Sequence, residues 1–399
     1  MTQQYLTGVS VVDVDDGTVA RDRAIGIADG VITAVLGADG VPEDAPARDL
    51  GGRYLMPGLI TVHTHLSIVF PFSDTDEDED PALTAFRSAS RATAALHAGA
   101  TTIRCVHEQH RADITLRDAA ARGWFTAPRI LAGGRALSTP GGHGQGTGSV
   151  YCTGPDEFYA AAMGELEAGA DHLKIFITGG LAHAGESPAE PEMTDAEIAA
   201  VVRAADSAGA YVVAHAGHFT AIRQALNAGV RSFEHGYLVD EDTAVLLAQP
   251  DVYVSPTLAV SRSVGWMRAN GFEEHSIANA VAVGPDHLTS AQRLIAAGVR
   301  LTNGTDYPPG DNADGVPAVV AELEFMAAAG LDPPAALQTV TVNGAALCGI
   351  SDTVGRIEVG QAADFIAMPA DPTVAVSALR DITFVMSGGR LIRDGSWAP

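Results

Sequence analysis

The feature that most constrains the fold is a strand-and-helix unit that recurs along the middle of the chain. Short, apolar, β-rich runs occupy 58–64, 100–106, 129–134, 171–177, 211–215, 230–235, 251–256 and 299–304. Alanine-rich segments lie between them, and several end in Ala-Gly-Ala or Ala-Gly-Val directly before the next run. A helix that ends at a glycine and leads into a buried strand is the repeating unit of a parallel α/β fold. Eight such units favour a closed (β/α)8 barrel, and the lack of GxGxxG after the first run argues against an open sheet.

The two ends of the chain carry a different pattern. Stretches such as LTGVSVVDVDDGTV and ITFVMSGGRLIRDG are short alternating strands separated by Gly and Asp turn signals. Neither end is long enough to bury a core alone, so we expect both to pair into one small β-sandwich. The predicted units are 1–55 and 349–399 for the sandwich and 56–348 for the barrel.

Charge and composition argue against several classes of partner. The formal net charge is −25 at pH 7, which argues against nucleic acid and anionic membrane surfaces as partners, because both need basic patches. No run of eighteen apolar residues and no secretion signal is visible. Three cysteines without motif spacing indicate a reducing compartment. We therefore expect a cytoplasmic homo-oligomer that acts on a small-molecule substrate.

Polar residues stand where the predicted strands end. The active site of such a barrel forms at the C-terminal ends of its strands. One residue of this kind would be explained by packing or hydrogen bonding, whereas a full set in strand order predicts a functional site. The set consists of His63, His65, Lys174, His215, His235 and Asp306.

Lys174 is the only lysine of the chain. The sequence contains 24 lysines and arginines together, and all the others are arginine. Its neighbours Leu173, Ile175 and Phe176 are apolar, so an ammonium here is costly to bury unless it is paired or chemically changed. A salt bridge to a carboxylate below the barrel is one alternative, and chemical modification is the other.

The strand-end residues stand in short motifs, which are HTH after a PGLI strand, then KIF, AHAG, FEHG and NGTD. This set of motifs resembles that of the amidohydrolase superfamily. Within it, the chain is similar to the binuclear branch that contains prolidase-like dipeptidases and imidazolonepropionase-like proteins. The resemblance covers nearly the whole chain, and it implies that CO2 carboxylates Lys174 and that the carbamate bridges two divalent metals. Arginine could not replace this lysine, because a guanidinium stays charged whereas burial lowers a lysine pKa from about 10.4.

The same resemblance implies a ligand set and a mechanism. His63, His65 and Asp306 would hold one metal, and His215 and His235 the other. Imidazole and carboxylate ligands fit zinc, with cobalt or manganese as alternatives. A hydroxide shared by the two metals would attack a carbonyl, and Asp306 would carry its proton to the leaving amine. The expected reaction is hydrolysis of an amide in a dipeptide or an N-acyl amino acid.

Two further residues are candidates for substrate contact. His143, in Gly141-Gly142-His143, is either a ligand of the substrate carbonyl or carboxylate or part of a structural glycine loop. Tyr237 is expected to donate a phenolic hydrogen bond to the carbonyl oxygen, as a similarly placed tyrosine does in relatives. Arg104 serves either a substrate carboxylate or an internal ion pair.

Two segments near the predicted rim have open roles. The acidic run 74–80 either selects a cationic substrate or is a solvated loop. The segment 257–288 is long for a connection between strands and predicts a helical lid, with Trp266 and Met267 near the substrate.

Other functions share these residues. A site with the same two metals could cleave a urea, carbamate, lactone or phosphoester. A deaminase is a third possibility, but the relatives with that activity usually use one metal without a bridging lysine, so the presence of Lys174 argues against it. A relative that has lost catalysis and only binds would be marked by a missing ligand, and none of the six is missing.

Overall fold

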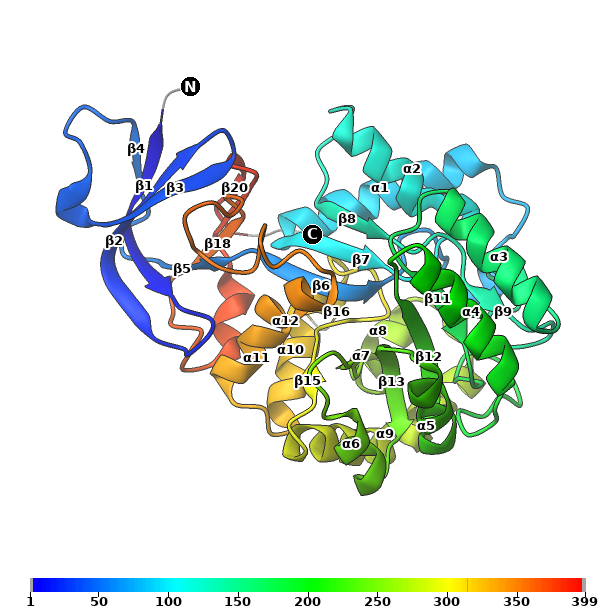
Figure 1. Ribbon diagram of the computed structural model, residues 1–399. Coiled ribbons are helices and arrows are strands. Elements are labelled where there is room, and N and C mark those ends of the chain that lie inside the picture. The colour runs from blue at the N-terminus through cyan, green and yellow to red at the C-terminus, as the bar shows by residue number, and fades with distance from the viewer. Residues whose placement is uncertain (1–2, 314, 397–399) are drawn as a thin grey trace.

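The computed structural model describes residues 3–313 and 315–396. Eight parallel strands form its central barrel, which helices surround in Figure 1. These strands are β6 (Leu59–Thr64), β7 (Ala100–Cys105), β8 (Arg129–Ala132), β11 (Leu173–Phe176), β12 (Val212–His218), β13 (Ser232–Leu238), β14 (Tyr253–Ser255) and β15 (Arg300–Leu301). Two backbone hydrogen bonds close the ring, from Asp171 N to Ala132 O and from Val62 N to Asn303 O, both 2.7 Å long. The predicted barrel is confirmed.

Helices surround the barrel as the alternating sequence predicts. They are α1 (Pro81–His97), α2 (Ala112–Ala121), α3 (Pro155–Glu167), α4 (Asp195–Ser207), α5 (Phe219–Ala228), α6 (Glu241–Leu247), α10 (Ala318–Ala328), α11 (Pro333–Thr339) and α12 (Val342–Leu347). The Ala-Gly phrases end helices: Gly169 after α3 and Gly229 after α5 have φ of 105° and 103°, a conformation that glycine adopts without steric cost. The buried strand that follows each glycine then enters the barrel.

The segment between β14 and β15 differs from its prediction. It forms three helices, α7 (Ala259–Arg262), α8 (Val264–Ala269) and α9 (Glu274–Ala296). The last of them begins inside the predicted segment 257–288 and continues past its end toward β15. Among the described residues, no helix has the length and apolar character that a membrane crossing needs.

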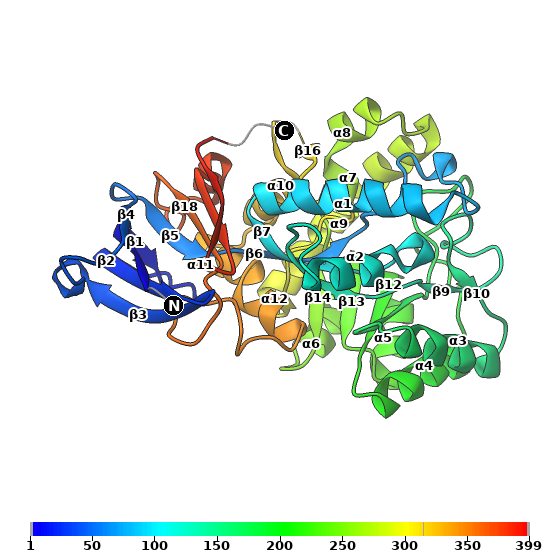
Figure 2. The same cartoon turned by 90° about the horizontal axis from the view of Figure 1, so that it is seen from above.

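Strands from both ends of the chain form one β domain beside the barrel, as Figures 1 and 2 show. The sheet order is β20-β19-β18-β5-β1-β2-β3, and β4 pairs with β1. Its strands are β1 (Gln4–Val12), β2 (Val19–Ala28), β3 (Val31–Gly37), β4 (Ala47–Asp49), β5 (Tyr54–Pro57), β18 (Phe365–Met368), β19 (Phe384–Ser387) and β20 (Arg390–Asp394). The C-terminal strand β18 pairs antiparallel with the N-terminal strand β5, so neither end forms this sheet alone.

Alternation along β18 gives the β domain two cores. Phe365 and Ala367 pack with residues of β1, β2 and β19 inside the domain, whereas Ile366 and Met368 pack against residues of α10 and α11. Successive side chains of a strand point to opposite faces. The predicted sandwich is therefore one continuous sheet that folds over its own core and attaches to the barrel through its other face.

Candidate active site

The strand ends place the six predicted ligands around one cavity, which we call the ligand cavity. It measures about 440 Å³, and its lining includes His63, His65, Lys174, His215, His235 and Asp306. Ligand atoms of His63, His235 and Asp306 lie within 4.8 Å of one another. Residues that are far apart in the sequence thus converge where a (β/α)8 barrel carries its chemistry.

Asp306 lies between the two histidines of the first strand. Its Oδ1 is 2.9 Å from Nε2 of His63 and 3.1 Å from Nε2 of His65. The other ring nitrogen of each histidine is already used: Nδ1 of His65 donates to the carbonyl of His107, and Nδ1 of His63 donates to Glu234. Nε2 of both rings therefore faces the same carboxylate oxygen. Two imidazoles and one carboxylate that converge in this way form a donor set that suits zinc.

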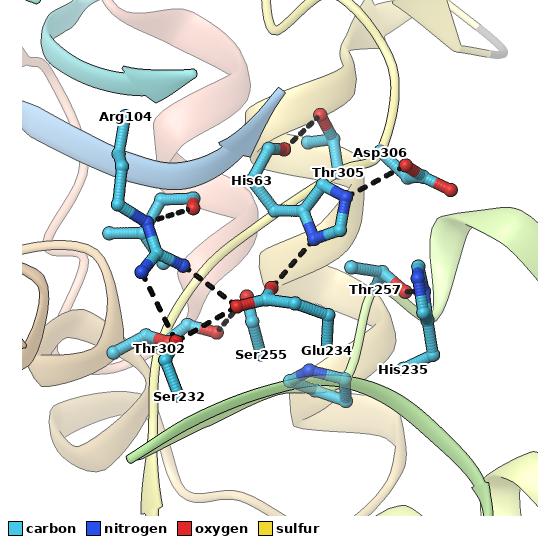
Figure 3. A network of polar contacts seen from close by, with 12 residues as sticks. His63, Arg104, Ser232, Glu234, His235, Ser255, Thr257, Thr302, Thr305 and Asp306 are labelled. Atoms are coloured by element: carbon cyan, nitrogen blue, oxygen red, sulfur yellow. Dashed lines mark hydrogen bonds and ion pairs between the residues drawn. The ribbon is translucent and has the colours of Figure 1, made fainter. Parts of the chain in front are cut away.

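Arg104 forms the internal ion pair that the sequence left open, and its partner Glu234, which also contacts His63, was missed from the sequence (Figure 3). Oε2 of Glu234 accepts the His63 bond at 2.6 Å, while its Oε1 accepts from Arg104 at 2.8 Å and from Ser232 at 2.9 Å. Burial raises the pKa of Glu234, but Arg104 and His63 outweigh burial and hold it at about 2. Arg104 therefore forms an internal ion pair and does not reach the cavity. The sequence feature that could have revealed Glu234 is an acidic residue within the apolar run 230–235.

Lys174 lies in the opposite wall of the cavity, and its side chain is buried. Burial lowers its pKa to about 8. Among the described residues its ammonium forms no hydrogen bond or ion pair, and the ring of Phe176 lies 5.6 Å away. The salt-bridge alternative is thus not supported, and a buried amine with a lowered pKa is the form that reacts as a nucleophile.

His215 and His235 add two neutral imidazoles to the lining of the cavity. Nε2 of His215 donates to the carbonyl of Gly179 at 3.1 Å, and Nδ1 of His235 lies 2.7 Å from the hydroxyl of Thr257. Burial lowers the pKa of both rings well below the ordinary value. One nitrogen of each ring therefore remains as a potential metal ligand.

Backbone strain is concentrated at the same residues. His235 and Asp306 have φ of 71° and 63°, and Thr257, which contacts His235, has φ of 49°. A non-glycine residue in this region costs about 1–3 kcal/mol and persists where the surrounding structure enforces it. At His235 the unusual φ interrupts strand alternation, so its ring reaches the cavity although the neighbouring Glu234 contacts the His63 ring from below.

His143 and Tyr237 both face the site. Nδ1 of His143 lies 2.6 Å from Oε1 of Glu186, and its ring centroid is 4.2 Å from that of His215. Burial lowers the pKa of His143, but Glu186 outweighs burial and the net shift is upward. The Tyr237 ring stacks on His235 at 5.1 Å, and burial raises its pKa well above the usual value. Both can therefore donate a hydrogen bond to a substrate.

The acidic run 74–80 stabilises the loop and helix around it. Glu79 forms an ion pair with Arg87, Glu77 accepts a hydrogen bond from Tyr151, and Asp80 caps α1. None of its residues lines the ligand cavity. Met267 lies near the site in a second cavity, whereas Trp266 packs behind it against Tyr307.

A closed (β/α)8 barrel with imidazole, amine and carboxylate groups at its strand ends is the architecture of a barrel hydrolase. The chain belongs to the amidohydrolase family, whose model matches residues 54–392.

Similarity to known proteins supports the assignment of this chain as a hydrolase. Ochratoxinase from Aspergillus niger is 26% identical over 96% of this chain and 85% of its own length. Imidazolonepropionase from Deinococcus deserti is 27% identical over 96% of this chain and 98% of its own length. A solved prolidase complexed with N-methylphosphonate-L-proline has a TM-score of 0.90 at 27% identity, covering 98% of this chain and 100% of its own. A solved Xaa-Pro dipeptidase with bound methionine has a TM-score of 0.88 at 28% identity, covering 98% and 99%.

Proposed function

We propose that this protein hydrolyses an amide bond at a pair of divalent cations, with zinc as the native metal and cobalt or manganese as substitutes. The observation that carries the proposal is the convergence of two imidazole nitrogens on one oxygen of Asp306, in a cavity that also holds a buried amine with no ion pair to a described residue. His63, His65 and Asp306 would hold one cation. His215 and His235 would hold the other, with modified Lys174 between them.

Modification of Lys174 follows from the chemistry of its amine. The neutral Nζ attacks the carbon of CO2, an N–C bond forms as one C=O π bond opens and its electron pair moves to oxygen, and one proton passes from nitrogen to the bicarbonate buffer, which gives a carbamate with one negative charge. Burial favours this step because it lowers the lysine pKa to about 8. Two carbamate oxygens suit two cations, whereas an ammonium repels both.

The residues of the chain then divide the hydrolytic work. The cations, when bound, lower the pKa of water and polarise the scissile carbonyl. Asp306 takes a proton from the attacking water and delivers it to the leaving amine nitrogen. Tyr237 and His143 donate hydrogen bonds to the substrate carbonyl. The names of the relatives, among them a prolidase and a Xaa-Pro dipeptidase, support a dipeptide or an N-acyl amino acid as substrate.

A substrate screen with metal analysis tests the proposal. Protein loaded with zinc, cobalt or manganese in bicarbonate buffer is offered dipeptides, N-acyl amino acids, carbamates, ureas, lactones, phosphoesters and aminated heterocycles. We expect amide cleavage and two metal equivalents per chain. Deamination by protein with one metal equivalent per chain would assign the protein to the mononuclear class instead. Cleavage of carbamates, ureas, lactones or phosphoesters but of no amide would show that the proposed substrate class is wrong.

A further inference from the structure

A second cavity, which we call the apolar pocket, opens beside the ligand cavity. It measures about 410 Å³, and its lining includes Phe72, Leu181, Val260, Met267, Phe272 and Tyr307. The two cavities share Phe72, His143, Ala182 and Asp306. A molecule whose scissile bond lies at Asp306 can therefore extend directly into the apolar pocket.

Aromatic packing holds the wall of this pocket in place. Trp266 stacks on Tyr307 with ring centroids 3.9 Å apart, and it lies 5.6 Å from Phe272. Phe70 joins the same cluster at 5.4 Å from Trp266 and 5.1 Å from Phe72. Aromatic pairs at these separations attract one another beyond their buried area. The pocket is therefore preformed, and a ligand does not have to order it.

Among the described residues that line the apolar pocket, the charged or readily charged groups are His143 and Asp306, and both lie at the edge that it shares with the ligand cavity. Among the described residues, no arginine lines either cavity, and the only lysine there is Lys174. The acidic run 74–80, which could have selected a cation, lines neither cavity. A charged side chain that extended past His143 and Asp306 to the apolar lining would lose its hydration without gaining an ion pair there.

We propose that the apolar pocket binds an uncharged, bulky side chain next to the scissile amide, with aromatic side chains preferred. The proposal rests on the amide hydrolysis proposed above and names its substrate class. Phe72, Leu181, Val260, Met267 and Phe272 would contact this side chain, while its amide lies near Asp306. An aromatic ring buries a large apolar area and fits a wall that is itself aromatic.

A matched substrate series measures this selectivity. N-acetyl derivatives of phenylalanine, leucine, alanine, aspartate and lysine are compared by kcat/KM with the metal-loaded protein. A single methylene in an apolar pocket is worth roughly 10- to 200-fold, so we expect phenylalanine and leucine to exceed aspartate and lysine by about 100-fold or more. Equal rates, or a preference for a charged side chain, would overturn the pocket assignment and leave amide hydrolysis standing.

Binding supplies a readout that does not depend on turnover. The free amino acids of the series are titrated calorimetrically into the metal-loaded protein, and phenylalanine should bind more tightly than aspartate or lysine. If no amide is cleaved but this order holds, amide hydrolysis fails and the pocket assignment survives. An order reversed toward charged amino acids refutes the pocket assignment in either case.

Two variants tie the selectivity to the apolar pocket. Leu181→Lys places a cation in the lining and should raise the relative rate with N-acetyl-aspartate, while Met267→Ala should lower the preference for phenylalanine without adding charge. Val281→Lys on α9 is the matched control, because Val281 is exposed and does not line the pocket. Circular dichroism checks folding of each variant. Unchanged selectivity in both pocket variants would contradict the assignment.

Discussion

Two walls of the ligand cavity present metal ligands, and they are held by different means. On the β6 side, His63 and His65 each donate a hydrogen bond through Nδ1, to Glu234 and to the carbonyl of His107. On the β11 side, Lys174 forms no hydrogen bond or ion pair to a described residue, and burial outweighs the attraction of Glu234 and Asp306 and lowers its pKa to about 8. The first wall is therefore oriented before a cation arrives, whereas the second becomes anionic only through chemistry on its lysine.

This difference assigns separate requirements to the two proposed metal positions. A cation between His63, His65 and Asp306 needs only the ligands that the fold already orients. A cation on the other side needs an anion at Lys174, because an ammonium would repel it. The first position should therefore fill in buffer free of CO2, and the second only with bicarbonate.

The largest effect is expected from Lys174→Ala. The variant loses the amine that would carry the anion, so we predict that amide hydrolysis falls below detection in a continuous assay. A short carboxylic acid added at high concentration should restore part of the activity, because it supplies a carboxylate to the vacated space. Wild-type turnover in this variant would show that the two walls do not depend on Lys174.

Asp306→Asn tests the carboxylate that lies between His63 and His65. The amide keeps the size of the side chain but cannot take a proton, and general acid–base groups contribute about 10²- to 10⁴-fold to rate. We predict a loss of that size in kcat with a smaller change in KM. Metal content is measured in parallel, since a variant that also loses metal would show a ligand role and not a proton-transfer role.

Glu234→Gln removes the charge that anchors the β6 wall. Residues that orient a metal ligand typically change metal affinity by about 10- to 100-fold when mutated, and we predict weaker zinc binding in that range, measured by competition with a chelator. Glu165→Gln is the matched control, because Glu165 is also buried and paired with arginines but lines neither cavity. Equal losses in both variants would mean that the effect is general destabilisation.

The smallest effect concerns the stability of the metal-free protein. The folded-state pKa of Lys174 is about 8, and a lysine in the unfolded chain has a pKa of about 10.4. The unfolded state binds more protons between these values, so stability should rise as pH increases from about 8 to about 10.4. Lys174→Met should raise the free energy of unfolding by about 3 kcal/mol at pH 7 and lose this advantage above that window. The free energy of unfolding of the wild type and of Lys174→Met is measured by denaturant titration at pH 7 and at pH 10.5. An equal difference between the two proteins at both pH values would contradict the lowered pKa.

The sequence predicted the contents of both walls but only one part of their support. Strand ends and Ala-Gly phrases located His63, Lys174 and Asp306, because local periodicity determines where a buried strand begins and ends. Glu234 was missed because its partners Arg104 and His63 come from other strands. Its neighbour His235 also breaks strand alternation at a φ of 71°, which no period in the sequence reveals.

The apolar pocket was equally out of reach of sequence patterns. A lid over 257–288 was predicted, and Met267 does lie in the lining, but Trp266 packs behind the wall against Tyr307. That contact joins α8 to the segment after β15, and it depends on tertiary packing and not on helical periodicity.

The measurement that tests the central claim most directly is a ¹³C NMR spectrum of the zinc-loaded protein after equilibration with ¹³C-bicarbonate. The account predicts a protein-bound carbamate resonance in the wild type that is absent in Lys174→Ala, together with two zinc equivalents in the wild type and one in the variant. A wild-type spectrum without that resonance, from fully loaded and active protein, would contradict it.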